Sequence, residues 1–261
     1  MKNFNFKSAA NTKEATKLAS GRATFLAGGM TLLPAIKLRL AAYSDLINIK
    51  KIKSLTGIKV SSKSLRIGAI TTHAEVAASK EVGKSISSLA ILAEGIGDPQ
   101  VRNRGTIGGS IANNDPAADY PSACLALNAT IHTNKRKISA NKFFKEMFET
   151  DLKKGELIES VEFEVPEKSA YAKFPNPASR YALVGVYVAK LKNEVRVAVT
   201  GVESCVFRCK KLEDILSKNF SSSAIDDVNI SSKGFNADIH ASAEYRAHII
   251  KVMAKKAVSS C

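Results

Sequence analysis

Residues 105–120 read G-T-I-G-G-S-I-A-N-N-D-P-A-A-D-Y, an adjacent glycine pair followed by two carboxylates, Asp115 and Asp119. Because glycine has no Cβ atom, it lets backbone N–H groups come close to a phosphate. Thr106 and Ser110 add hydroxyl donors on either side of the pair. The pattern predicts a phosphate-binding nest, with a tight turn as the alternative. The nest would consist of Thr106, Ile107, Gly108, Gly109 and Ser110.

A second glycine pair lies upstream, within residues 27–31. It follows an apolar stretch that predicts a strand at 24–27 and precedes a helical pattern at 32–40. A loop between a strand and a helix can bind phosphate through its free N–H groups. The chain contains neither the G-x-G-x-x-G fingerprint nor a Walker A loop. Two such loops predict a ligand with two phosphates, and the upstream loop consists of Ala27, Gly28, Gly29, Met30 and Thr31.

Four further side chains are candidates for chemistry, each with a structural alternative. Asp119 precedes a helix expected at 121–127, so we expect it to cap that helix, and its carboxylate could also accept a hydrogen bond from a ribose hydroxyl. Tyr181 begins an apolar strand and could either cover a flat ring system or pack in the core. His73 lies inside a capping box formed by Thr72 and Glu75, which explains its position without catalysis. Asp115 precedes Pro116 and is expected in a turn.

The composition is that of an ordinary globular protein, with 45% hydrophobic and 24% charged residues among 261. No apolar run approaches the roughly 18 residues that a membrane span needs. Residues 1–7 lack the apolar core of a signal peptide. We therefore expect a cytoplasmic protein without a transmembrane segment, and a peripheral position at the inner membrane face is compatible with the same features.

The net charge of +15 raises nucleic-acid binding as a possible function. However, the lysines are spread along the chain, and no arginine-rich or aromatic-interleaved patch appears. Solvated lysine faces, or a patch for an acidic partner protein, are favoured. The four cysteines, at 124, 205, 209 and 261, form no C-x-x-C pair, so reduced structural thiols are expected and no metal site. Since no catalytic constellation stands out, any chemistry would belong to a bound cofactor.

The chain divides into three sections. Residues 1–50 alternate helix and strand, and residues 51–166 contain hairpins expected at 58–69 and around 134–135. Regular structure is expected to disappear at 95–114. Three prolines make 166–177 a plausible crossing between domains. Beyond it we expect a hairpin at 184–200 and a closing helix at 244–258.

Three ordered motifs carry a family resemblance: Leu26–Leu40, Ile67–Val76 and Gly97–Pro121. Together they resemble the FAD-binding (medium) subunit of the molybdenum hydroxylases, the aerobic carbon monoxide dehydrogenase and xanthine dehydrogenase family. The medium subunit of carbon monoxide dehydrogenase is the nearer of the two. The likeness continues through residues 155–158 and 241–246, so it covers nearly the whole chain.

The resemblance implies an α+β fold. An FAD-binding domain of the vanillyl-alcohol-oxidase (PCMH) type would occupy residues 1–166, with subdomains at about 1–50 and 51–166. A small C-terminal α+β domain of the carbon monoxide dehydrogenase flavoprotein type would occupy 167–261. The implied partners are a small subunit with [2Fe–2S] clusters and a large molybdopterin subunit, in a heterotrimer that dimerises. FAD would carry electrons from the clusters to an external acceptor.

Carried over by position, the resemblance assigns the FAD pyrophosphate to the two glycine loops. Asp119 would meet the ribityl or ribose region, and Tyr181 would lie against the isoalloxazine. Leu157 or Ile158 would line the adenine pocket. Met30 departs from the polar residue frequent at that position, although its backbone N–H still can donate. Two alternatives stay open, a stand-alone FAD-dependent oxidoreductase of the same fold and a basic binding module.

Overall fold

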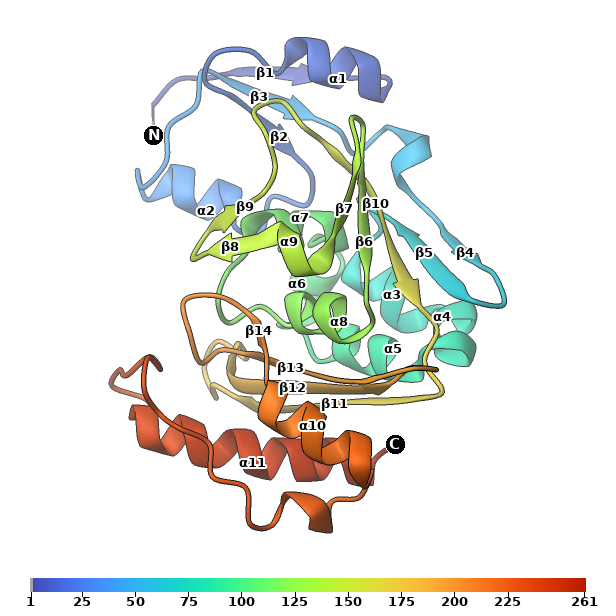
Figure 1. The fold of residues 1–261 in the computed structure, drawn as a ribbon. Coiled ribbons are helices and arrows are strands. Elements are labelled where there is room, and N and C mark those ends of the chain that lie inside the picture. Colours follow the sequence, from blue (N-terminus) through green and yellow to red (C-terminus); the bar gives the residue numbers. More distant parts are fainter. Residues whose placement is uncertain (1) are drawn as a thin grey trace.

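The computed structural model describes residues 2–261, arranged in three layers that follow one another along the chain (Figure 1). The first layer is a three-stranded parallel sheet in the order β1-β3-β2. Parallel neighbours need crossover connections, which two short helices provide. The central strand buries Leu46 and Ile47. The elements are β1 (Asn5–Ser8), α1 (Thr12–Leu18), β2 (Ala23–Leu26), α2 (Leu32–Lys37) and β3 (Asp45–Asn48).

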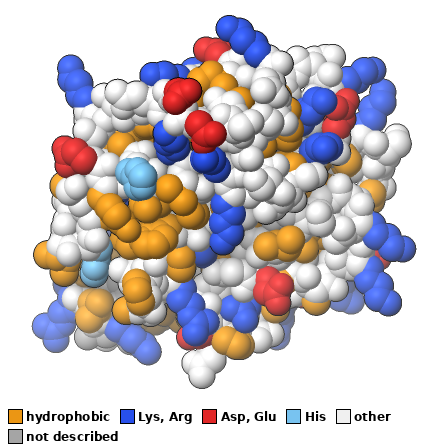
Figure 2. Space-filling model, turned by 90° about the horizontal axis from the view of Figure 1, so that it is seen from below, with side chains coloured by type: hydrophobic (Ala, Val, Ile, Leu, Met, Phe, Trp, Pro, Cys, Tyr) orange, Lys and Arg blue, Asp and Glu red, His pale blue; other side chains and the backbone are white. Residues whose placement is uncertain are grey.

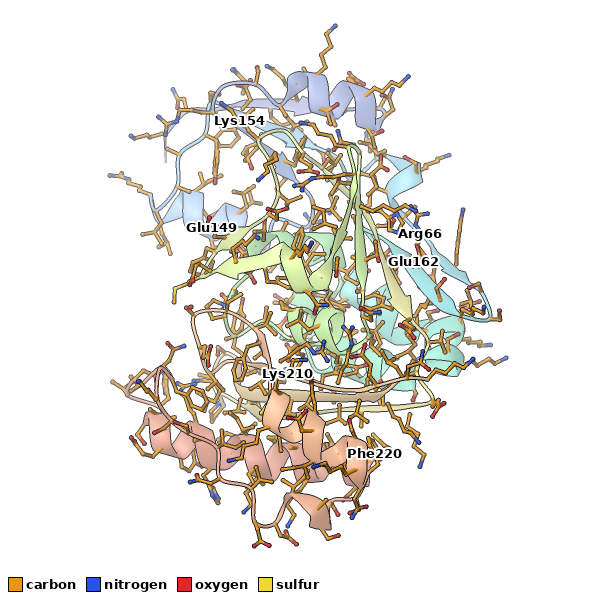
Figure 3. All side chains as sticks on the ribbon, viewed as in Figure 1. Arg66, Glu149, Lys154, Glu162, Lys210 and Phe220 are labelled. Atoms are coloured by element: carbon orange, nitrogen blue, oxygen red, sulfur yellow. The ribbon has the colours of Figure 1, made fainter. Side chains whose placement is uncertain are left out.

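The second layer is a five-stranded antiparallel sheet in the order β4-β5-β10-β6-β7, covered by helices. Its strands are β4 (Ile58–Val60), β5 (Ser64–Gly68), β6 (Thr130–Thr133), β7 (Lys137–Ser139) and β10 (Ile158–Glu164). Side chains alternate between its faces. Leu65, Ile67, Val161 and Phe163 are buried in the core, whereas Arg66 and Glu162 lie opposite each other in register on the other face (Figure 3).

In the sequence, the helices of this layer lie between its strands, except η1, which precedes β4. They are η1 (Lys53–Leu55), α3 (His73–Ala78), α4 (Lys80–Ser85), α5 (Ser87–Glu94), α6 (Pro99–Arg102), α7 (Ile107–Asn113), α8 (Tyr120–Ala126) and α9 (Ala140–Phe143), with the small hairpin β8 (Phe144–Glu146) and β9 (Glu149–Thr150). The pairing of β4 with β5 and of β6 with β7 confirms the two predicted hairpins. The expectation for 95–114 is wrong, because α6 and α7 occupy most of this segment.

The third layer is a four-stranded antiparallel sheet with helices on both faces (Figure 1). Its elements are β11 (Lys168–Pro175), β12 (Ala182–Lys190), β13 (Val195–Thr200), β14 (Phe207–Arg208), α10 (Lys210–Lys218), η2 (Ser223–Ile225) and α11 (Ala243–Ser259). The pairing of β12 with β13 and the extent of α11 confirm the predicted hairpin and closing helix. The predicted crossing at 166–177 is wrong for most of its length, because residues 168–175 pair with β12.

The face below the C-terminal sheet gathers hydrophobic side chains, with Lys and Arg scattered around them (Figure 2). Ile239, Tyr245 and Val252 are exposed hydrophobic residues of this part of the chain. This face therefore lacks the continuous basic surface of a nucleic-acid groove. Among residues 2–261, no helix combines the length and apolar character that crossing a bilayer requires.

Candidate functional site

The loop at residues 27–31 connects β2 to α2. Gly29 has φ of +78°, a left-handed conformation that favours glycine. Among residues 2–261, the N–H groups of Gly28, Gly29, Met30 and Thr31 find no hydrogen-bond acceptor. Four unpaired N–H groups in successive residues fit the negative oxygens of a phosphate.

This loop is in direct contact with the start of the second one. A Cβ atom built on Gly28 would lie 2.1 Å from the carbonyl oxygen of Arg104 and 2.9 Å from the Cα atom of Gly105. Only glycine permits so close an approach. The structure therefore brings together the two glycine loops, which are separated by more than seventy residues in the sequence.

The second loop differs from the predicted nest, because its residues form the start of α7. Thr106 is the N-cap, and its Oγ1 accepts the N–H of Gly109 at 3.2 Å. Gly109 is exposed at this helix start, and Ser110 is half-buried. The glycines thus lie in the first turn of a helix instead of an irregular loop.

Gly108 has a packing role that the sequence pattern does not reveal. Its N–H donates to the carbonyl of Ala69 at 2.8 Å, and an added Cβ would lie 2.6 Å from that oxygen. The N–H of Ile107 is likewise used, by the carbonyl of Thr71 at 3.1 Å. Within residues 2–261, the N–H of Thr106 has no acceptor, and the residue is buried. The upstream loop therefore offers more free N–H groups than the second.

Asp119 stands before α8 but does not cap it through its side chain, which corrects the expected role. Its Oδ1 instead accepts the hydroxyl of Tyr171 and pairs with Nζ of Lys173 at 3.0 Å. Burial raises the pKa of Asp119, against the opposing effects of Lys173 and Tyr171. Among residues 2–261, no side chain donates a hydrogen bond to Oδ2, and the residue is 5% exposed.

Asp115 is a turn residue, as the sequence predicts, because its Oδ1 accepts the N–H of Ala117 at 2.9 Å. Tyr181 lies just before β12 and is 43% exposed, so it is not a core residue. Burial of its hydroxyl raises the pKa of Tyr181, and the nearby charges of Asp115 and Asp119 raise it further. An exposed aromatic ring thus stands beside the segment that follows α7.

Leu157 and Ile158 are both buried, each 4% exposed, and belong to different core clusters. The backbone of Leu157 is tied on both sides to Asn134: the Leu157 N–H donates to Oδ1 at 2.8 Å, and its carbonyl accepts the N–H of Asn134 at 3.0 Å. Their place in an adenine pocket stays a prediction.

His73 is the first residue of α3, where Thr72 and Glu75 form the predicted capping box. Its ring is buried against Gly105 and Tyr120, with ring centroids of His73 and Tyr120 5.3 Å apart. Burial, aided by the charge of Arg102, lowers the pKa of His73 to about 4. The four cysteines are free, and among residues 2–261 no group of three or more metal-binding side chains comes together.

The model of a protein family described as the FAD binding domain in molybdopterin dehydrogenase matches residues 2–167. The chain belongs to this family. It is an FAD-binding subunit of the medium-chain type, part of a flavoprotein oxidoreductase. The fold is accordingly a PCMH-type FAD-binding domain followed by a small C-terminal α+β domain. The boundaries of the domains at residue 166 and at about residue 50 stay predictions.

Relatives with similar chains act in several enzymes. The glyceraldehyde dehydrogenase medium chain of Sulfolobus acidocaldarius is 35% identical, covering 97% of this chain and 96% of that one. The carbon monoxide dehydrogenase medium chain of Hydrogenophaga pseudoflava is 32% identical, with coverages of 91% and 88%. The identity is therefore not highest to carbon monoxide dehydrogenase, and the likeness points to the subunit type without selecting one substrate.

A solved structure of reconstituted carbon monoxide dehydrogenase from Oligotropha carboxidovorans has a chain with the same fold. The TM-score is 0.92 at 26% identity, and the match covers 99% of this chain and 97% of that one. The similarity includes the C-terminal sheet as well as the first two layers.

Sequence reasoning missed three residues that shape this site. Arg104 supplies the carbonyl against which Gly28 packs, and Tyr171 and Lys173 hold the Asp119 carboxylate. Tyr171 and Lys173 lie more than fifty residues from Asp119 in the sequence. Tyr171 and Lys173 are two residues apart on β11, so their side chains point to the same face of the sheet. This spacing is the one sequence signal that could have placed them together.

Proposed function

We propose that this chain binds FAD between its two glycine loops and passes electrons from the [2Fe–2S] clusters of a small partner subunit to an external acceptor. A large molybdopterin subunit would oxidise the substrate, in a heterotrimer that dimerises. The observation that carries the proposal is the contact of Gly28 with Arg104 and Gly105, beside four N–H groups that have no acceptor among residues 2–261.

The residues of this chain would bind and orient the cofactor. The N–H groups of residues 28–31 and of Thr106 would donate to the pyrophosphate, with the Ser110 hydroxyl beside them. Asp119 would accept a ribityl or ribose hydroxyl through Oδ2, and Tyr181 would lie along the isoalloxazine. When bound, FAD supplies reversible two-electron chemistry that links one-electron carriers to the acceptor.

The first test is an absorption spectrum of the purified chain after incubation with FAD and gel filtration. We expect flavin bands near one FAD per chain. Reduction of the bound flavin by substrate should then require the partner subunits, because the proposal assigns substrate oxidation to the molybdopterin subunit. A chain without flavin bands would end the proposal, and substrate turnover by the isolated chain would support a stand-alone oxidoreductase instead.

Gly28→Ala tests the loop contact. The added methyl group overlaps the carbonyl oxygen of Arg104, so the two loops must separate. We expect loss of bound FAD together with a decrease of about 1–3 kcal/mol in the free energy of unfolding. The matched control is Gly83→Ala in α4, where an added Cβ meets nothing within 4 Å. That variant should keep its FAD and gain about 0.5 kcal/mol. FAD content unchanged in Gly28→Ala would refute the assigned loop.

A further inference from the structure

A buried ion pair joins the second and third layers of the molecule. Nζ of Lys173, on β11, lies 3.0 Å from Oδ1 of Asp119, which precedes α8. The side chains are 11% and 5% exposed, respectively. The Tyr171 hydroxyl, from the same face of β11, donates to the same oxygen. A buried ion pair often contributes little net stability compared with apolar side chains, so its presence here calls for another role.

The Lys173 ammonium also donates hydrogen bonds to two backbone carbonyls from separate segments. It donates to the carbonyl of Gly95 at 2.8 Å and to that of Arg180 at 3.1 Å. An ammonium group has three N–H donors. With Asp119 as the third partner, all of them are used.

The carbonyl of Arg180 belongs to a tight turn that ends at Tyr181. The N–H of Asn176 donates to the carbonyl of Tyr181 at 2.7 Å, and the N–H of Arg180 to that of Asn176 at 2.9 Å. Arg180 has φ of +62°, and its guanidinium donates to the carbonyl of Gly97 at 3.1 Å. The turn that contains the Arg180–Tyr181 peptide is therefore held by its own backbone hydrogen bonds and by the contact of the Arg180 side chain with Gly97 of the second layer.

We propose that Lys173 is a positioning residue that, through the carbonyl of Arg180, holds the Tyr181 ring beside the FAD site. The inference rests on the proposed function. Without the Lys173 ammonium, the Arg180 carbonyl loses its donor and the buried Asp119 carboxylate loses its counter-charge. The turn would then relax and Tyr181 would leave its place, while the loops at 27–31 and 106–110 stay intact.

Fluorescence of bound FAD tests this inference, because a tyrosine ring in contact with an isoalloxazine quenches its emission by electron transfer. The FAD-loaded protein is compared with Tyr181→Phe, Lys173→Met and the double variant at equal FAD content. We expect Tyr181→Phe and Lys173→Met each to raise the emission several-fold, and the double variant to be no brighter than Tyr181→Phe. The control is Lys190→Met on β12, whose surface pair with Glu167 is remote from the turn, and it should match the unmodified protein.

The outcomes separate the two proposals. A protein that takes up no FAD overturns the proposed function itself. FAD-loaded Lys173→Met with unchanged emission, or emission that rises additively in the double variant, overturns the positioning role. Unchanged emission in Tyr181→Phe also overturns it. Should Lys173→Met lose its FAD, Lys173→Gln decides instead, because its shorter side chain keeps a donor but cannot reach both carbonyls; FAD-loaded Lys173→Gln as dim as the unmodified protein contradicts the inference.

Discussion

At the scale of single residues, glycines in similar motifs serve different physical purposes. Gly28 lets two backbone segments touch, and in the described part of the chain its own N–H has no acceptor. Gly108 also lies against backbone, at Ala69, but its N–H is already bonded there. A sequence pattern of two adjacent glycines predicts close approach in both cases. Whether the backbone N–H of such a glycine is left for a ligand or is bonded within the protein depends on the residues that pack against that glycine.

Burial of His73 predicts that the free energy of unfolding decreases at acidic pH. Its folded-state pKa of about 4 lies below the unfolded value of 6.5, because burial disfavours the charged ring. Above pH 6.5 neither state binds the proton. Below it the unfolded chain does, so the free energy of unfolding should fall by about 3 kcal/mol as the pH drops from 6.5 toward 4.

The measurement is urea unfolding at several pH values on the native protein and on His73→Phe. The variant should lose that part of the pH dependence between 6.5 and 4. Replacement of the exposed His248 by Gln is the control and should leave the curve unchanged. A native protein equally stable at pH 6.5 and pH 4.5 would contradict the buried neutral ring.

At the scale of elements, α7 shows tertiary contacts overriding local preference. Two glycines within I-G-G-S-I-A-N disfavour a helix, so the sequence predicts a loop. The helix forms because Thr106 caps it, Ile107 and Ile111 are fully buried, and Gly108 packs against Ala69, the residue after β5. Small residues here allow the helix to lie close to the sheet.

The caps of α7 and α3 offer a matched pair of variants. Thr106→Ala and Thr72→Ala each remove a side-chain oxygen that accepts an N–H at 3.2 Å, and each should lower the free energy of unfolding by about 1 kcal/mol. Thr106→Ala should in addition weaken FAD binding, because Thr106 starts the second loop. FAD titration followed by fluorescence separates the two. Equal FAD affinity in both variants would place the cofactor away from α7.

At the scale of the whole molecule, the C-terminal sheet contributes side chains to two hydrophobic cores. Along β12, Val184, Val186 and Val188 pack toward α10 and α11, whereas Tyr187 and Ala189 belong to the core of the second layer. Successive side chains of a strand point to opposite faces, so one strand serves both cores. One face of the third layer's sheet is thus buried against the second layer.

Arg246 connects α11 to the C-terminal sheet through hydrogen bonds. Its guanidinium donates to the carbonyls of Leu183 and Gly201, both at 2.8 Å, and pairs with Asp238 at 2.7 Å, while the side chain is 3% exposed. Arg246→Met should lower the free energy of unfolding by about 3 kcal/mol, because two buried carbonyls lose their donor. Lys255→Met removes an exposed pair with Asp226 on the same helix and should have no measurable effect in the same denaturation assay. Equal stability of the two variants would show that Arg246 does not hold the helix.

The sequence by itself determined the hairpins, the capped helices and the family. Hairpins with polar turns and helices with capping boxes depend on neighbours in the chain, and the ordered motifs at residues 26–40, 67–76 and 97–121 identify the FAD-binding subunit. These features are local, so their residues carry the information directly.

The tertiary structure alone decided how distant residues share the site. It showed that Asp119 pairs with Lys173 instead of capping α8, and that residues 168–175 form a strand instead of a linker. It also showed that most free N–H groups lie in the first loop. Each of these depends on a contact between segments far apart in the chain, where the partner of a buried charge or N–H is set by packing, and no local pattern records that partner.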